Sequence, residues 1–238
     1  MAEAQQTARS AHKPAALEFS FNESVFEPLH SGALYWRAKQ TLLVADLHLE
    51  KLSSFASRGQ FLPPYDTGMT LLRLETDIRT TGSQRVIALG DSFHRNEGVH
   101  TLLDQDRARL DRLTQIAEWV WLSGNHDAKP HGIGGHCRPS LREGNFSFHH
   151  EPRVGTAGQV SGHLHPAARV YINGRSARRR CFVFDQETLI LPAYGASTGS
   201  LNILGPAFAG LFKLHDLKVL MLGRDRIYPV NPKRLAAG

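Results

Sequence analysis

The chain has 238 residues, of which 41% are hydrophobic and 21% charged, as in globular proteins long enough to bury one substantial core. Its formal net charge of +6 favours an anionic partner such as nucleic acid, a nucleotide or anionic lipid. Two cysteines, Cys137 and Cys181, are too few for a disulfide framework and indicate reduced thiols. No apolar run approaches the length of about 18 residues that a transmembrane helix needs, so we expect a cytoplasmic protein with no membrane partner.

The first sixteen residues differ from the remainder of the chain. Residues 1–16 are rich in Ala, Gln and Ser and contain no apolar stretch, so we expect a disordered arm and no signal peptide. Residues 17–238 contain no internal repeat and no clear linker. We therefore expect them to form a single domain.

Apolar patterning predicts alternating strands and helices in the first half of the chain. The predicted strands are residues 19–25, 33–37, 40–45, 84–89 and 118–122, and the predicted helices are 66–80 and 104–117. Asp66 is expected to cap the first helix, with Met69, Leu72 and Ile78 among its apolar positions. A loop rich in glycine and proline is expected at residues 128–139.

The second half is predicted to be mostly antiparallel strand. Asn173-Gly174 between residues 169–172 and 181–184 is a strong hairpin signal. Further strands are expected at residues 146–148, 159–161, 188–191 and 218–222. The patterning alone therefore indicates an α/β fold with an antiparallel second half.

Polar motifs follow the predicted strands in a regular order. They are Asp46-Leu47-His48, Gly90-Asp91, Gly124-Asn125-His126-Asp127, His149-His150 and Gly162-His163-Leu164-His165. Each motif alone is explained as well by a turn or an incidental histidine. Together they supply the oxygen and imidazole ligands that divalent metals bind, at the strand ends where α/β sheets place their sites. The ordered set therefore favours a site for a pair of metal ions, for which a carboxylate can form a bridge.

This order of motifs resembles the calcineurin-like metallophosphoesterase superfamily, over residues 46–165. A narrower resemblance, to the bacterial ligase-associated DNA damage response endonuclease family, covers almost the whole chain. It rests on Leu47-His48-Leu49-Glu50-Lys51, Arg58-Gly59, Leu62-Pro63, His150-Glu151-Pro152, Arg180-Cys181-Phe182 and Leu191-Pro192-Ala193-Tyr194-Gly195. The resemblance implies a four-layer α/β/β/α sandwich, with two mixed sheets covered by helices.

The resemblance also implies a ligand set for two divalent metal ions. It assigns Asp46, His48 and His165 to one ion, assigns Asn125, His150 and His163 to the other, and makes Asp91 the bridge. His149 is the second choice for the position of His150. Mn²⁺ is the expected metal, and Fe, Zn, Ni or Co also suits these ligands.

The implied reaction is attack on phosphorus by a metal-bridging hydroxide in line with the leaving group. His126 would assist the leaving oxygen, with Asp91 or Asp127 orienting its imidazole. His94 is a candidate supporting residue beside the ligands, although an exposed loop histidine explains it equally well.

The densest positive run contains Arg175, Arg178, Arg179 and Arg180. We expect it in or just after the hairpin turn, where it either contacts a phosphate backbone or forms a solvated loop. Ser200 stands where the family pattern has a second glycine after Gly199, which puts the shape of that loop in doubt.

The sequence thus predicts a two-metal phosphodiesterase or endonuclease. The resemblance implies a DNA substrate and a role in DNA repair, in functional association with a DNA ligase and a helicase. The alternatives are a small cyclic or nucleotide phosphodiesterase, a nucleotide-sugar pyrophosphate hydrolase, and a non-catalytic scaffold. A scaffold would be expected to have lost ligands or His126, and here the set is complete.

Overall fold

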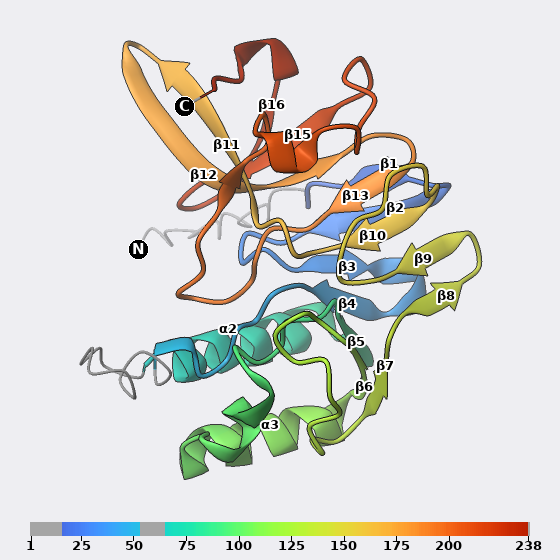
Figure 1. The fold of residues 1–238 in the computed structure, drawn as a ribbon, viewed down its shortest axis with the longest axis vertical. Helices are drawn as coiled ribbons and strands as arrows, with labels where there is room; N and C mark the ends of the chain where they lie inside the picture. Colours follow the sequence, from blue (N-terminus) through green and yellow to red (C-terminus); the bar gives the residue numbers. More distant parts are fainter. Residues whose placement is uncertain (1–15, 53–64, 238) are drawn as a thin grey trace, which may run out of the picture.

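The computed structural model describes residues 16–52 and 65–237 (Figure 1). All but the last residue of the expected N-terminal arm lies outside the described residues, as do the Arg58-Gly59 and Leu62-Pro63 pairs. No helix within the described ranges is both long and apolar enough to cross a membrane.

Seven strands form the first sheet in the order in which they occur along the chain. They are β1 (Phe19–Phe21), β2 (Ser24–Pro28), β3 (Leu34–Trp36), β4 (Thr41–Val44), β5 (Arg85–Ala88), β6 (Glu118–Leu122) and β7 (His136–Arg138). Pairing is antiparallel from β1 to β4 and parallel from β4 to β7. The carboxyl ends of β4, β5 and β6 therefore lie at one edge of this sheet.

The second sheet is also mixed. It contains β8 (Leu141–Glu143), β9 (Phe146–Phe148), β10 (Gln159–Ser161), β11 (Pro166–Ile172), β12 (Arg175–Phe184), β13 (Thr188–Ile190), β14 (Leu201–Asn202), β15 (Lys218–Leu222) and β16 (Ile227–Val230). Strand β10 is parallel to both β9 and β13, whereas β12 is antiparallel to β11, β13 and β15.

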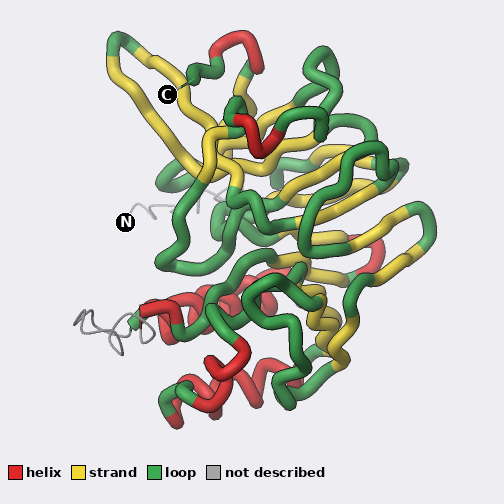
Figure 2. The backbone as a smooth tube through the Cα atoms, viewed as in Figure 1, coloured by secondary structure: helices red, strands yellow, loops and turns green. Residues whose placement is uncertain are grey.

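Aromatic and aliphatic side chains from both sheets form the central core. Trp36 and Phe26 of the first sheet pack against Phe146 of the second, with ring centroids 4.8 and 5.7 Å from that of Phe146. A second apolar cluster joins the other face of the first sheet to α2 (Asp66–Thr81) and α3 (Asp104–Ile116). Figure 2 shows these two helices together on one side of the strands.

The outer face of the second sheet is covered differently. A third apolar cluster joins Val183 and Val219 of that sheet to Ile203, Phe208 and Leu217. Within the described residues, this covering segment consists of loops and the short 3-10 helix η3 (Pro206–Phe208). The expected α/β fold with two mixed sheets is confirmed, and the fourth layer is loop and 3-10 helix where α-helix was expected. The remaining 3-10 helices are η1 (Arg37–Lys39), η2 (Asn96–His100) and η4 (Pro232–Arg234).

The predicted capping and facing of α2 were wrong in two details. Tyr65 is the N-cap residue and makes no capping bond with its side chain, whereas Asp66 accepts a hydrogen bond from the Leu52 N–H at 3.1 Å. Met69 and Leu72 are 62% and 54% exposed. The buried positions include Leu71, Leu74 and Ile78, so the apolar stripe is narrower than the apolar residues of the helix suggest.

Two segments expected to be loop form strands. Strand β7 lies inside residues 128–139, where it pairs in parallel with β6. Strand β12 begins at Arg175, directly after the Asn173-Gly174 turn, and the whole basic run pairs with β11. Alternate arginines of this run therefore point to opposite faces of the hairpin.

Candidate metal centre

The predicted polar motifs meet at one edge of the two sheets. Main-chain hydrogen bonds join the loops that carry them. The His48 N–H donates to the Asp91 carbonyl at 2.9 Å, and the Gly162 N–H donates to the His150 carbonyl at 3.1 Å. The Gly195 N–H donates to the Asp46 carbonyl at 3.1 Å. Loops from both sheets are thus fixed against each other around the same space.

A first cluster consists of Asp46, His48 and His165. The Nε2 atoms of His48 and His165 face each other at 3.2 Å, and His165 Nε2 lies 3.5 Å from Asp46 Oδ1. The carboxylate of Asp46 also accepts the His163 N–H at 3.0 Å. The Asp46 side chain is fully buried and that of His165 is 17% exposed, so the cluster opens to solvent on the His165 side.

A second cluster consists of Asp91, His150 and His163. Three atoms surround His150 Nε2, namely Asn125 Oδ1 at 2.9 Å, His163 Nδ1 at 3.1 Å and Asp91 Oδ2 at 3.3 Å. The other ring nitrogen, Nδ1, donates to the Leu89 carbonyl at 2.9 Å. That bond fixes the ring so that Nε2 points into the cluster.

Asp91 lies between the two clusters. Its Oδ2 is 3.3 Å from His150 Nε2 in the second cluster and 3.9 Å from His48 Nε2 in the first. Its Oδ1 accepts the His126 N–H at 2.9 Å. A single carboxylate oxygen thus faces both groups, which is the arrangement that a bridging ligand requires.

The structure brings His150, and not His149, into the cluster. His149 lies on the other side of its strand, where its Nε2 is 3.0 Å from Gln159 Oε1. Strand β9 ends at Phe148 and the chain bends at His150, whose ring contacts the Leu89 carbonyl and the Asn125 side chain.

Left-handed backbone is concentrated in these motifs. The φ angles of Asp46, His48, Asp91, His163 and His165 lie between +44° and +68°. Each such residue costs on the order of 1 kcal/mol or more, and residues of this kind gather at functional sites. Because the backbone turns sharply at each motif, two neighbouring polar side chains can face one point.

Burial and charge together set the protonation of the cluster. Burial favours neutral Asp91, but the hydrogen bond and charge of His150 lower the pKa of its carboxyl to about 2. Burial also favours neutral His150, but Asp91 and Asp46 raise the pKa of its imidazole to about 9. Burial lowers the pKa of His48 to about 4. Asp91 and His150 therefore form a buried ion pair, while His48 is neutral.

His126 lies at the mouth of the site. Its side chain is 40% exposed, and its Nε2 lies 4.0 Å from Asp91 Oδ2. Its Nδ1 donates to the main-chain carbonyl of His94 at 3.1 Å. The His94 ring stacks on the His126 ring, with centroids 5.1 Å apart. His94 therefore contacts His126 through both its backbone and its ring.

Asp127 was one of two residues expected to orient the His126 imidazole, but its carboxylate bonds elsewhere. Its carboxylate accepts main-chain N–H groups of Ser92 at 2.7 Å, Phe93 at 3.0 Å and Gly124 at 3.1 Å. Asp127 thus joins the loop after β5 to the loop after β6. Main-chain carbonyl groups orient the two imidazoles: that of Leu89 orients His150, and that of His94 orients His126. No sequence motif predicts a main-chain partner of this kind.

The donor set fits a pair of divalent metal ions. Ligand atoms about 2.1 Å from one ion, at tetrahedral or octahedral angles, lie roughly 3.0 to 3.4 Å apart. The facing nitrogen pairs, at 3.2 Å in the first cluster and 3.1 Å in the second, have this spacing. In each pair a buried imidazole faces a half-buried one, and nitrogens this close are suited to sharing a cation.

The predicted basic residues lie apart from these clusters, on β12. Arg178 donates to the Ser200 carbonyl and Arg180 to the Ala193 carbonyl, both at 2.5 Å. Arg179 donates to the Arg178 carbonyl at 3.0 Å, and Arg175 is exposed at the start of the strand. Arg180 is half-buried and the other three are exposed, whereas a solvated loop was one of the two expectations for this run.

No family model matches the sequence, and no curated protein matches it. Among solved structures, the crystal structure of Pseudomonas putida nuclease MPE aligns with this chain at a TM-score of 0.68 and 28% identity, covering 90% of this chain and 100% of that chain. The phosphoesterase YfcE from E. coli aligns at a TM-score of 0.37 and 16% identity, covering 83% of this chain and 96% of that one.

The fold, the two buried clusters of Asp and His, and the similarity to nuclease MPE agree with one another. The chain is therefore an enzyme of the metallophosphoesterase superfamily.

Proposed function

We propose that this enzyme is a two-metal phosphodiesterase that cleaves nucleic acid. The observation that carries the proposal is the position of Asp91, whose Oδ2 faces both His48 and His150. Nuclease MPE, with 28% identity over 90% of this chain, supports nucleic acid as the substrate. The choice of DNA and of Mn²⁺, a part in DNA repair beside a ligase and a helicase, and a cytoplasmic location stay predictions from the family resemblance.

We assign the ligands as the clusters suggest. Asp46, His48 and His165 would hold one ion, and Asn125, His150 and His163 would hold the other, with Asp91 between them. Two bound ions would lower the pKa of a water molecule and neutralise phosphate oxygens. The ion pair of Asp91 with protonated His150 implies that a proton leaves His150 when metal binds.

His126 is the residue we assign to the leaving group. Because Nδ1 is held by the His94 carbonyl, Nε2 is the nitrogen available to exchange a proton at the site. The ring is 40% exposed, whereas the side chains of His48 and His150 are 4% and 5% exposed. His126 can therefore reach a bound substrate without being needed to hold metal.

The test is hydrolysis of bis-p-nitrophenyl phosphate and of p-nitrophenyl phosphate by protein stripped of metal and then given Mn²⁺, Zn²⁺ or Mg²⁺. We expect metal-dependent cleavage that prefers the diester, and His126→Ala should lose roughly 10²- to 10⁴-fold in kcat, the range for a general acid. His136→Ala, an exposed histidine on β7, is the matched control and should retain activity. Equal activity of the His126 and His136 variants would contradict the assignment.

A DNA oligonucleotide with a label at one end then tests the substrate class. Metal-dependent cleavage at internal positions would establish an endonuclease. Diester hydrolysis without any cleavage of the oligonucleotide would contradict the nuclease proposal and favour a small-molecule phosphodiesterase.

A further inference from the structure

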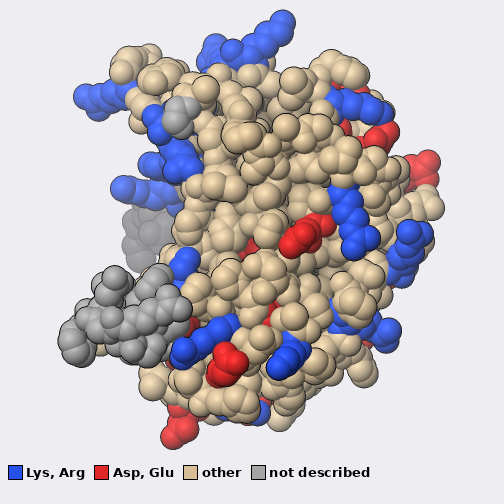
Figure 3. All heavy atoms as spheres, in the orientation of Figure 1, with Lys and Arg blue, Asp and Glu red and all other residues tan. Residues whose placement is uncertain are grey.

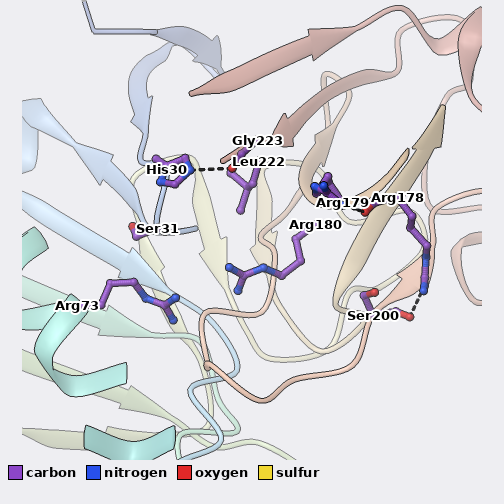
Figure 4. Close-up of a pocket in the computed structure, with 9 residues that line it drawn as sticks. All are labelled: His30, Ser31, Arg73, Arg178, Arg179, Arg180, Ser200, Leu222 and Gly223. Carbon is purple, nitrogen blue, oxygen red and sulfur yellow. Dashed lines mark hydrogen bonds between the residues drawn. The ribbon is translucent and has the colours of Figure 1, made fainter. Parts of the chain in front are cut away.

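A cavity of about 500 Å³ is lined mainly by basic side chains. We call it the arginine pocket. Its basic lining residues are His30 from the turn after β2, Arg73 from α2, and Arg178, Arg179 and Arg180 from β12. Figure 4 shows the guanidinium groups of Arg73 and Arg180 pointing into the same space from α2 and β12.

The four arginines of the pocket have no ion-pair partner among the described residues. Within residues 16–52 and 65–237, none of the four makes an ion pair with Asp or Glu inside 4.0 Å, and no acidic residue lines the pocket. Asp77 is close enough to interact electrostatically with Arg73, but it accepts the hydrogen bond of the Tyr194 hydroxyl. Figure 3 likewise shows basic and no acidic side chains along the upper left of that view, where the β11–β12 hairpin lies.

Hydrogen bonds to main-chain carbonyls orient three of the guanidinium groups, and each keeps further N–H groups that can donate to a ligand. Arg73 donates to the Tyr194 carbonyl, Arg180 to the Ala193 carbonyl and Arg178 to the Ser200 carbonyl. These bonds occupy one donor atom of each guanidinium, which carries five N–H groups in a planar fork. The Nε of Arg73 is buried and has no hydrogen-bond partner among the described residues.

The two central arginines repel each other. Burial and the charge of Arg73 both lower the pKa of Arg180, which means that the pair is held together at a cost in free energy. An anion between the two would relieve that repulsion. A phosphate group has the charge and the oxygen geometry that arginine forks bind.

The pocket is connected to the metal centre through one short loop. Ala193 and Tyr194 accept the bonds from Arg180 and Arg73 on one side. On the other side, the Tyr194 N–H donates to the Ala45 carbonyl at 2.7 Å, and the next residue bonds to Asp46. A ligand in the pocket would therefore lie one loop away from the first metal cluster.

We propose that the arginine pocket binds a phosphate group other than the one that reacts at the metal centre. The inference rests on the proposed function, because the bound phosphate would belong to a polynucleotide substrate and neighbour the phosphate that reacts. A free phosphate or the phosphate of a mononucleotide would offer the same chemistry, and the experiment below separates the two sources.

The first measurement compares kcat/KM for a DNA oligonucleotide with kcat/KM for bis-p-nitrophenyl phosphate, which carries a single phosphate. Using the ratio removes any disturbance of the metal centre that both substrates share. We expect Arg73→Gln and Arg180→Gln each to lower the ratio about tenfold through KM, since either glutamine can still donate to the loop carbonyl. Arg79→Gln, which removes an exposed charge from the same helix, should leave the ratio within twofold.

Equilibrium binding provides a readout that does not need turnover. Fluorescence anisotropy of a labelled oligonucleotide is measured over a range of salt concentrations for the same variants. Loss of one phosphate contact should weaken binding and reduce the slope of log K against log salt by about one. Unchanged affinity and slope in both pocket variants, with an unchanged kinetic ratio, would overturn the proposal.

Inorganic phosphate serves as the small-ligand probe. Suppose that inorganic phosphate stabilises the wild-type protein against heat, that both pocket variants lose that stabilisation, and that the wild type binds no oligonucleotide. That result would show that the pocket holds a free phosphate. It would contradict the nuclease proposal without contradicting the pocket. Stabilisation that is the same in wild type, both pocket variants and Arg79→Gln would contradict the pocket assignment.

Discussion

At the residue scale, the close approach of loop backbones decides where the ligands lie. A Cβ atom on Gly124 would lie 2.1 Å from Asp91 Oδ1 and 2.8 Å from Asp127 Oδ1. Any side chain at this position must therefore displace the carboxylate that faces both clusters. The glycine before Asn125 is as much a part of the site as the residues that would touch metal.

Gly124→Ala is expected to lower diester hydrolysis by roughly 10- to 100-fold, as loss of a group that orients ligands does. The same variant should bind less metal. Gly199→Ala is the matched control, because no described atom lies within 4 Å of a Cβ added there, and its activity should stay within twofold of wild type. Full activity and metal content in the Gly124 variant would show that the loop can shift without effect.

The sequence predicted which Asp and His residues the structure brings together, but not how their side chains are oriented. The ordered motifs contain every member of both clusters, and the family resemblance, with the histidine directly before Glu151-Pro152, favoured His150 over His149. The role of Asp127 was missed because its partners are main-chain N–H groups of Ser92, Phe93 and Gly124. Such contacts depend on where loops distant in sequence lie, and apolar periodicity carries no information on that.

At the element scale, α2 shows how burial divides one helix. Leu74 is fully buried between the helices and the first sheet, whereas Leu72, two residues away, is 54% exposed. Residue type alone predicts the same burial for both leucines. Each residue is rotated by about 100° around the helix axis from the one before it, so residues two positions apart point to different faces. This rotation places one leucine on the face that packs and the other on the face in solvent.

Leu74→Ala is expected to lower the free energy of unfolding by about 2 to 5 kcal/mol through the cavity that it leaves. Leu72→Ala should change it by no more than about 0.5 kcal/mol, as exposed substitutions do. Urea unfolding of the two variants and wild type measures both values. Similar losses in the two variants would contradict the described orientation of α2.

The loop between β6 and β7 contains a histidine whose neutral form the fold favours. His131 packs on Trp121 and Phe93, with ring centroids 4.8 and 5.0 Å away, and its Nδ1 accepts the Ile133 N–H at 3.3 Å. Burial, with a smaller effect of Arg107, lowers the pKa of His131 from 6.5 to about 4. Between these two values the unfolded chain binds a proton that the folded protein does not, so stability falls as the pH drops from 6.5 to 4.

His131→Asn keeps an acceptor near the position of Nδ1 and cannot be protonated. Between pH 7 and pH 5, wild type should lose on the order of 1 kcal/mol more stability than this variant, allowing for the partial exposure of the ring. Urea unfolding at the two pH values gives the difference. Parallel losses in both proteins would mean that His131 does not contribute to acid sensitivity.

The basic run on β12 illustrates a limit of prediction at this scale. A turn at Asn173-Gly174 was correctly predicted, but charge density suggested that the arginines after it would lie in a loop. Pairing with β11 extends β12 through the whole run, and the strand places Arg180 beside Arg73. The partner residue on α2 is about a hundred positions away in the sequence, and no local pattern links the two.

At the scale of the whole molecule, the two clusters join the two sheets. Asp46, Asp91 and Asn125 follow strands of the first sheet, and His150, His163 and His165 follow strands of the second. Bound metal would therefore stabilise the packing of one sheet on the other. An ion present at 100 times its dissociation constant contributes about 2.7 kcal/mol.

Removal of metal with a chelator is thus expected to lower the melting temperature of wild-type protein by about 5 to 10 °C. Asp91→Asn, which weakens the group shared by both clusters, should show less than half of that shift. His136→Ala should show all of it. Equal shifts in wild type and Asp91→Asn would indicate that the stabilising metal is held elsewhere.

In the proposed site, Asp91 would hold two metal ions together, with His126 beside them. Metal content per chain, measured by mass spectrometry of elements after loading and desalting, tests it most directly. We predict about two ions per chain in wild type and in His126→Ala, and a clear loss in Asp91→Ala. Two ions retained by Asp91→Ala, or a loss of metal in His126→Ala equal to that in Asp91→Ala, would contradict the account.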